Sequence, residues 1–371
     1  MKKIALSITG IFLIASFLLS GVINEDKPLK GMWNFNMVKL WEVEEAGKDF
    51  FVSMRIRSDE NETVFVADQK NFKTYIFDKS GKFILSFGKK GEGPGEMKRF
   101  GSLYLENNKL IYYENNRVHY FSKEGKYIET VIIPGDLTPR LFIDENSFIS
   151  APRMNWEDPK GESRCIIYNV KDKNKKLLFE YFTYKKGVAR RASKKSRSTF
   201  SFSNSSITPM LVLAYRDNKI YFGMNNEYKI KVKDLKSRDE FDFSIKRKEK
   251  FVPGVYKNEI LKGVNFPADV KRQIKEGLPD HFTFFEGILI DRNGNIYVFV
   301  TDPVEENSRK IDIFSAGGTY IYSAEIKVEK GLVIRSSHFS NDKLYMGVEN
   351  EDGDLKLVKY KIDIPKISLR K

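Results

Sequence analysis

Short apolar runs separated by polar turns repeat along the chain after residue 60. Each unit opens with a turn rich in Asp, Asn and Gly, as in "SDENETVFVAD" and "IDRNGNIYVFV", and continues into alternating β-branched and aromatic residues. Such turns close tight hairpins, and such alternation is typical of half-buried strands. The pattern occurs six times, and the strand after each turn is centred on one apolar residue: Phe65, Ile111, Phe148, Ile220, Ile296 and Leu344.

A second element follows each of these strands. It consists of a strand, a polar turn and another strand, as in "KTYIFDKSGKFILSF" and "KIDIFSAGGTYIYSAEI". Six units of about four short strands are what a six-bladed β-propeller requires, because no blade can bury both of its faces alone. We therefore predict an all-β chain folded as a six-bladed β-propeller. The earlier segment "MVKLWEVEE" also alternates, and we expect it to add to the sixth blade and close the ring.

Two intervals between these central residues are too long for a single blade. Phe148 and Ile220 are 72 residues apart, and Ile220 and Ile296 are 76 apart. The second interval contains "YKNEILKGV" and "ADVKRQIKEGL", whose apolar spacing predicts a short helical insertion between blades 4 and 5. The first interval contains "YKKGVARRASKKSRSTF", for which we expect an exposed loop.

The N-terminal sequence "MKKIALSITGIFLIASFLLSGV" places two lysines before an uncharged run. This order predicts a secretory signal peptide or, because the run has the length of a bilayer span, an uncleaved membrane anchor. We expect residues 1–23 to form this leader or anchor, residues 24–36 a linker, and residues 37–371 the propeller domain. The protein is then exported and lies in the periplasm, outside the cell, or tethered to the membrane by its N-terminal segment.

The loop "FGKKGEGPGEM" either cradles a phosphate or turns a corner between blades. No glycine at the Walker spacing precedes Lys-Ser or Lys-Thr, and the dinucleotide pattern G-x-G-x-x-G fails at Glu96. Pro94 removes one backbone donor, and Glu92 would repel a phosphate. We therefore predict a connection between blades that binds no nucleotide.

A longer stretch around this loop carries a family resemblance. "VFVADQKNFKTYIFDKSGKFILSFGKKGEGPGEM" is similar to an NHL-type repeat, and residues 64–131 resemble exported bacterial six-bladed propeller proteins related to NHL proteins. The resemblance implies the fold but no single activity, because such propellers serve as interaction platforms, ligand binders, lyases or hydrolases. Asp68 and Asn71 match the polar turn of the repeat, and we expect them to hydrogen-bond the local backbone.

The chain is strongly basic, with 64 Lys and Arg against 50 Asp and Glu and a formal charge of +14. The excess either belongs to scattered, solvated lysines or attracts an anionic lipid or an envelope polyanion. A nucleic acid is not an expected partner of an exported protein. The candidates for polyanion contact are the basic residues of the first long interval: Lys185, Lys186, Arg190, Arg191, Lys194, Lys195 and Arg197.

Candidate chemistry is sparse. Cys165 is the single cysteine and the three histidines stand far apart, which excludes an internal disulfide and a Cys/His metal cluster. We predict no catalytic residue, metal ligand or cofactor. Residues just after the inner strands of a propeller can face its channel, and the candidates for this position are Glu114, Arg153 and Asp302.

The leading functional interpretation is a monomeric, non-enzymatic propeller that acts as a platform for an unknown protein or small-molecule ligand. The ligand would contact the channel mouth or the inserted segments. The alternative is a propeller-type lyase or hydrolase with a central divalent metal held by carboxylates.

Overall fold

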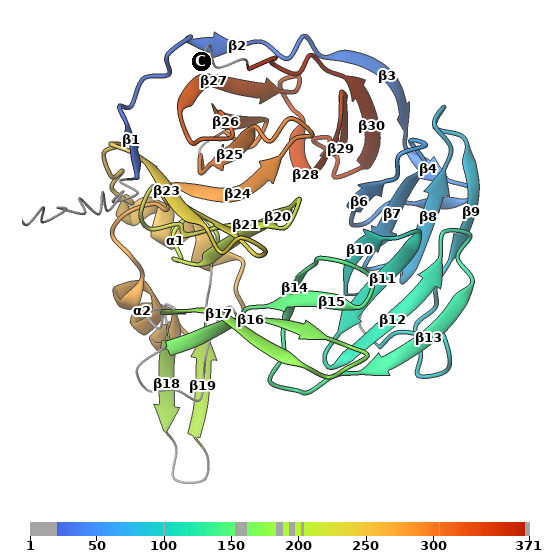
Figure 1. The fold of residues 1–371 in the computed structure, drawn as a ribbon. Helices are drawn as coiled ribbons and strands as arrows, with labels where there is room; N and C mark the ends of the chain where they lie inside the picture. Colours follow the sequence, from blue (N-terminus) through green and yellow to red (C-terminus); the bar gives the residue numbers. More distant parts are fainter. Residues whose placement is uncertain are drawn as a thin grey trace, which may run out of the picture.

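A ring of six β-sheets forms the body of the molecule (Figure 1). The computed structural model describes residues 21–98, 101–152, 162–182, 188–192, 197–201, 204–303 and 305–367. Within these residues, each sheet is a blade whose strands follow one another in antiparallel order from the centre of the ring to its rim. The predicted six-bladed β-propeller is therefore confirmed.

Blades 1 to 3 form the half of the ring that comes first in the chain. Blade 1 comprises β6 (Arg55–Ser58), β7 (Val64–Asp68), β8 (Lys73–Phe77) and β9 (Phe83–Phe87). Blade 2 comprises β10 (Ser102–Glu106), β11 (Lys109–Glu114), β12 (Arg117–Ser122) and β13 (Tyr127–Ile132). Blade 3 comprises β14 (Pro139–Phe142), β15 (Ser147–Ser150), β16 (Glu162–Asn169) and β17 (Lys175–Phe182).

Blades 4 to 6 complete the ring. Blade 4 comprises β20 (Leu211–Arg216), β21 (Lys219–Met224), β22 (Lys229–Asp234) and β23 (Glu240–Ile245). Blade 5 comprises β24 (Phe285–Ile290), β25 (Ile296–Val300), β26 (Ser308–Phe314) and β27 (Tyr320–Lys327). Blade 6 comprises β28 (Val333–Ser340), β29 (Lys343–Glu349), β30 (Leu355–Lys361) and, from the start of the chain, β3 (Val38–Val43).

The repeat pattern corresponds directly to the blades. The six central apolar residues each lie in the second strand of a blade, and the side chains of all six are 0% exposed. The polar turns before them adopt the left-handed conformation that Asn and Asp tolerate: Asn107 and Asn108 have φ of 45° and 63°, and Asp217 and Asn218 have φ of 49° and 63°. Each of these pairs closes a two-residue hairpin, as the sequence predicts.

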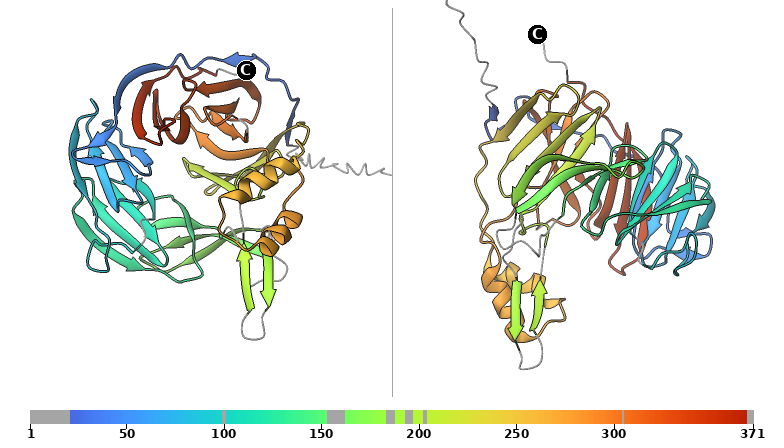
Figure 2. Two further views of the ribbon diagram at one scale, coloured as in Figure 1. Left: turned by 180° about the vertical axis from the view of Figure 1, so that it is seen from behind. Right: turned by 60° about the horizontal axis from the view of Figure 1, so that its bottom comes forward.

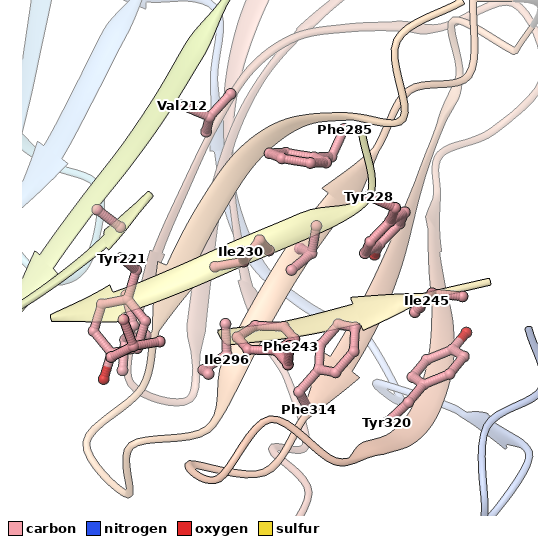
Figure 3. Close-up of a cluster of buried hydrophobic side chains, with 14 residues drawn as sticks. Val212, Tyr221, Tyr228, Ile230, Phe243, Ile245, Phe285, Ile296, Phe314 and Tyr320 are labelled. Carbon is pink, nitrogen blue, oxygen red and sulfur yellow. The ribbon is translucent and has the colours of Figure 1, made fainter. Parts of the chain in front are cut away.

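Aromatic and aliphatic side chains fill the space between neighbouring blades. Figure 3 shows the cluster between blades 4 and 5, where Phe243 and Phe314 have ring centroids 4.8 Å apart. Tyr228 and Tyr320 lie in the same cluster with their rings buried. Because each cluster takes side chains from two sheets, every blade is stabilised by its neighbours.

The first described residues wrap around the outside of the ring (Figure 1). β1 (Val22–Asn24) pairs in parallel with β23, β2 (Met32–Trp33) pairs in parallel with β27, and β3 pairs antiparallel with β30. Residues 21–43, here called the N-terminal belt, therefore cover the outer edges of blades 4, 5 and 6. The expected closure of blade 6 by residues 37–45 is confirmed, and the expected linker region, 24–36, runs along blades 4 and 5.

A buried lysine joins blade 6 to blade 1. Lys359 is 1% exposed, and its Nζ donates to Glu62 Oε2 at 2.5 Å and to the carbonyl oxygen of Lys79 at 2.9 Å. The indole N–H of Trp41, in the belt, donates to the same carbonyl at 3.0 Å. The junction where the first and last blades meet is thus held by polar contacts as well as by strand pairing. A small hairpin of β4 (Glu45–Ala46) and β5 (Asp49–Phe50) follows the belt.

Asp68 ends the second strand of blade 1 and is fully buried. Its carboxylate accepts hydrogen bonds from the backbone N–H groups of Val52 at 2.8 Å, Lys70 at 3.0 Å and Asn71 at 3.2 Å. The side-chain amide of Asn71 donates to the carbonyl oxygen of Phe50 at 3.0 Å. The predicted structural role of Asp68 and Asn71 is confirmed.

The glycine-rich loop connects blade 1 to blade 2, as the sequence predicts. The N–H of Gly91 donates to the carbonyl oxygen of Met97 at 3.1 Å, and the N–H of Met97 donates to the carbonyl oxygen of Lys89 at 3.0 Å. The N–H of Gly93 donates to the carboxylate of Glu96 at 3.1 Å. The anionic group that this loop holds is therefore one of its own side chains.

Both long intervals contain inserted elements outside the blades. α1 (Gly254–Lys262) and α2 (Ala268–Gly277) lie between blades 4 and 5 and confirm the predicted helical insertion. Among the described residues, neither helix combines the length and hydropathy needed to cross a bilayer. The sequence predicts an exposed loop between blades 3 and 4; in the described part of that interval, β18 (Val188–Ala192) and β19 (Arg197–Ser201) instead pair as a hairpin. A hairpin of two short strands is only marginally stable by itself. β18 lies against α2, and this contact stabilises the hairpin (Figure 2).

Candidate functional site

The first strands of the six blades surround a central channel (Figure 1). β6 lies beside β10 and β28, and β20 lies beside β14 and β24. The two faces of each first strand pack against the neighbouring blades, so it is the inner edges of these strands, and the residues at their ends, that border the channel. We call the end of the channel where each first strand turns into the second the turn mouth. The opposite end, beside the inserted helix α1, is called the lobe mouth.

Ionisable side chains from four blades gather near the turn mouth. This channel cluster consists of Arg57 from blade 1, Glu106 from blade 2, Asp144 from blade 3 and His338 from blade 6. Each of the four is partly buried. The cluster forms because the ring brings together strand ends that are up to 281 positions apart in the sequence.

Glu106 is the most perturbed carboxyl group of the cluster. The pKa of Glu106 is raised to about 7, first by burial and then by the negative charge of Asp144, while the positive charge of Arg57 partly opposes the rise. Burial also lowers the pKa of Arg57. Near neutral pH, Glu106 can therefore either donate or accept a hydrogen bond in the channel.

His338 is held as a neutral imidazole. Burial lowers the pKa of His338 to about 3, and the nearby charge of Arg57 contributes in the same direction. The backbone N–H of Ser58 donates to His338 Nε2 at 3.1 Å, which links blade 1 to blade 6. The lone pair on Nε2 is used in this contact, so His338 positions the start of blade 1 and remains uncharged.

A cavity of about 430 Å³ opens at the turn mouth. Its walls come from blades 1, 4, 5 and 6 and combine the polar side chains of Asp59 and Arg216 with the apolar ones of Ile288 and Phe339. Arg216 Nη1 donates to the carbonyl oxygen of Ile290 at 3.4 Å, which directs this side chain across the junction of blades 4 and 5. The cavity thus offers guanidinium donors beside an apolar surface.

A second cavity, of about 650 Å³, lies at the lobe mouth between α1 and blades 5 and 6. Asp302, one of the predicted channel-facing residues, lines it and forms an ion pair with Lys310 at 2.6 Å. Glu286 and Arg309 also line it, and burial raises the pKa of Glu286 while the charge of Arg309 opposes the rise. These charges are largely balanced within blade 5.

The other predicted site residues occupy different environments. Glu114 is 4% exposed and accepts the backbone N–H of Lys98 at 3.3 Å, beside the connection between blades 1 and 2. Arg153 lies outside the described residues. Of the basic run, Arg190 and Arg191 lie in β18 and Arg197 in β19, whereas Lys185, Lys186, Lys194 and Lys195 lie outside the described residues.

Cys165 is fully buried, and burial raises the pKa of its thiol to about 12, as expected for a structural cysteine. Within the described residues, no group of three His, Cys, Asp or Glu side chains is arranged to hold a metal ion.

Sequence reasoning missed the channel cluster. Its members are spread over four repeats, and no local motif links them. One signal was available: Arg57 and Glu106 are charged residues at or next to the ends of first strands, in "MRIRS" and "SLYLE". Once the first strand of each blade is assigned, charges at these ends indicate side chains near one mouth of the channel.

The chain matches one protein family by sequence and several solved proteins by structure. The DUF5128 family, described as a 6-bladed β-propeller, matches residues 48–264. No curated protein matches the sequence. A DUF4221 family member from Bacteroides vulgatus has a similar structure, with a TM-score of 0.58 and 12% identity over 89% of this chain and 98% of that one.

A Bacteroides fragilis protein described as a "putative exported protein" is also similar, with a TM-score of 0.54 and 12% identity over 93% of this chain and 99% of that one. At this identity both structures show the fold alone. The resemblance to NHL-type repeats stays a prediction.

Proposed function

We propose a function for this chain as a member of the DUF5128 family of six-bladed β-propellers, to which it belongs. The protein is exported, and it binds a ligand at the turn mouth without transforming it. The observation that carries the proposal is the cavity at the turn mouth, whose walls come from four blades and include Asp59 and Arg216. The channel cluster lies near the same mouth. Export is supported by the charged and apolar N-terminal sequence and by the description of the Bacteroides fragilis neighbour.

The residues at the turn mouth suit a small polar ligand. Guanidinium groups bind carboxylate and hydroxyl oxygens, and Arg216 presents one beside the apolar side chains of Ile288 and Phe339. Glu106 can accept a hydrogen bond from a ligand hydroxyl or amine when it is ionised, and donate one when it is protonated. Sugars and short peptides combine such oxygens, hydroxyls and apolar faces, so we propose this class of ligand.

A thermal-shift screen with sugars, amino sugars and short peptides tests the proposal. A ligand of the turn mouth raises the melting temperature of the parent, and Arg216→Leu or Glu106→Gln removes most of this rise. Lys126→Ser, on the outer strand side of blade 2 and exposed, is the matched control and should keep the full rise. A ligand whose effect survives both channel substitutions binds elsewhere and contradicts the proposal.

The enzymatic alternative has one observation in its favour. A carboxyl group with a pKa near neutrality is suited to general acid–base chemistry, and Glu106 has one. If the protein is a lyase or hydrolase, incubation with the ligand found in the screen yields product, and Glu106→Gln abolishes product formation while leaving binding. Metal analysis of the purified protein tests the central divalent metal of the same alternative.

A further inference from the structure

The positive charge of the protein is concentrated in one part of the fold. The inserted stretches of the sequence, residues 183–207 and 246–282, contain sixteen Lys and Arg and five Asp and Glu, a formal charge of +11. We call the described part of these stretches, residues 188–192, 197–201, 204–207 and 246–282, the lobe. The whole chain has +14, so the propeller body is nearly neutral. The lysines of this protein are therefore not evenly scattered.

The lobe is a packed unit of its own. Its core consists of Ile207, Val252, Leu261, Val270, Ile274 and Leu278, all buried. β18 lies against α2, which holds the hairpin of basic residues on the helices. Figures 1 and 2 show the lobe projecting from the ring beside blades 3 and 4. A projecting surface of this kind can meet a partner without contact from the blades.

Two large apolar side chains on the lobe are left in water. Phe251 is 65% exposed and Val255 is 71% exposed. Phe251 lines an open depression with three basic residues, Lys257, Arg272 and Lys275, and two acidic ones, Glu276 and Asp280, of which Asp280 pairs with Lys257. Apolar side chains surrounded by basic ones are typical of surfaces that lie in the interface of an anionic bilayer.

The basic residues around this depression are available for a partner. Arg272 and Lys275 line the depression, and Lys248 and Lys250 precede Phe251 in the chain. None of these four forms an ion pair with another described residue, whereas Lys257 pairs with Asp280 at 2.8 Å. Charge alone would fit any polyanion. The exposed Phe251 and Val255 contribute to binding only where the partner has an apolar layer beneath its charges.

We propose that the lobe docks on the surface of an anionic lipid bilayer. Basic residues of the hairpin and helices contact the headgroups, and Phe251 and Val255 enter the boundary between headgroups and acyl chains. A basic residue near such a surface contributes about 1 kcal/mol, or about fivefold in binding. The proposal is independent of ligand binding at the turn mouth, which lies at the opposite end of the channel.

Vesicle co-sedimentation of the full chain tests this proposal. The probes are vesicles of phosphatidylcholine alone and of a phosphatidylglycerol–phosphatidylcholine mixture, and the neutral vesicles measure any binding by the N-terminal apolar sequence. We expect the parent to bind the mixed vesicles at least about tenfold more tightly at low salt. The difference should largely disappear at about 0.5 M salt, where the Debye length is about 4 Å. Equal binding to both vesicles would overturn the proposal.

Two variants with equal loss of charge separate the lobe from the rest of the surface. The lobe variant carries R190S, R191S, K194S and K195S. The control carries K126S, K171S, K236S and K330S, four exposed lysines on the propeller body. We expect the lobe variant to bind the mixed vesicles at least about tenfold more weakly than the control. Equal weakening in the two variants would show that only net charge matters and would overturn the proposal.

A third variant distinguishes a bilayer from a soluble polyanion. F251S combined with V255S changes only exposed side chains, so the fold is kept. We expect severalfold weaker binding to mixed vesicles and unchanged retention on a heparin column. If this variant binds vesicles as the parent does, the lobe binds through its charge alone. Its partner would then be an anionic polymer, and the bilayer proposal would be wrong.

Discussion

Arg247 forms a two-armed ion pair with Asp312 at the junction of blades 4 and 5, with Nη1 2.7 Å from Oδ2 and Nη2 3.5 Å from Oδ1. The hydroxyl groups of Tyr228 and Tyr320 donate to the same carboxylate at 2.5 Å and 2.6 Å. Arg247 also reaches Asp26 in the N-terminal belt at 2.7 Å. One buried carboxylate therefore connects two blades, and its arginine partner extends the connection to the belt.

Asp312→Ala should lower the free energy of unfolding by about 3–5 kcal/mol, because it leaves two tyrosine hydroxyls without their acceptor and leaves Arg247 with only Asp26 as an ion-pair partner. Urea denaturation followed by tryptophan fluorescence measures the change. Glu42→Gln is the control: Glu42 pairs with Lys39 at 2.9 Å on the surface, and its loss should cost less than about 1 kcal/mol. Similar costs for the two variants would show that the Asp312 network contributes little.

Lys359→Met should weaken the junction between blades 6 and 1. The methionine retains the apolar stem but leaves Glu62 and the carbonyl oxygen of Lys79 without their closest donor. We expect a loss of about 2–4 kcal/mol in the free energy of unfolding. Lys361→Met, exposed in the same strand, should change stability by less than about 0.5 kcal/mol. A parent-like value for Lys359→Met contradicts this account of the closure.

Glu106→Gln should stabilise the protein at alkaline pH and have little effect at acid pH. The pKa of Glu106 is raised from 4.5 to about 7 in the folded protein, so its contribution to stability is fully present below 4.5 and is lost as the pH rises through about 7. The glutamine variant does not ionise, so it does not lose this stability. We expect its free energy of unfolding to exceed that of the parent by about 1–3 kcal/mol at pH 8.

Denaturation at a series of pH values measures this difference. Glu92→Gln is the control, because the hydrogen bond from Lys98 lowers the pKa of Glu92 and its neutral variant gains nothing as the pH rises. A constant difference between Glu106→Gln and the parent from pH 4 to pH 8 would show that Glu106 does not titrate as described.

Gly95→Val should destabilise the connection between blades 1 and 2 far more than Gly93→Val. Gly95 has φ of +75°, and a Cβ there would lie 3.2 Å from Tyr127 Cβ. A Cβ at Gly93 would meet only the mobile carboxylate end of Glu96, at 3.3 Å. We expect the free energy of unfolding to fall by about 2 kcal/mol or more in Gly95→Val and by less than about 1 kcal/mol in Gly93→Val. Melting temperatures of the two variants give the comparison, and the reverse order would contradict it.

The sequence predicted the blades because their signals are local. Phe65 and Ile296 each stand in an alternating strand after an Asp- and Asn-rich turn, and strand, turn and burial follow from a dozen neighbouring residues. β1 and β2 could not be predicted, since segments as short as Met32–Trp33 become strands only by pairing with an edge that is formed elsewhere.

The channel cluster escaped prediction for the same physical reason. Arg57 and His338 influence each other's environment only because blade 6 returns to blade 1, and no spacing in the sequence encodes that contact. The hairpin of the basic run was missed because β18 is supported by α2, which follows it by more than sixty residues.

The N-terminal belt makes the completion of the fold depend on contacts between distant parts of the chain. β1, β2 and β3 precede the first blade in the sequence, but they pair with β23, β27 and β30 of the last three blades. Contacts between residues so far apart in the chain form slowly. β3 therefore stays unpaired until β30 has formed, and the closure of the ring is a late and slow step of folding.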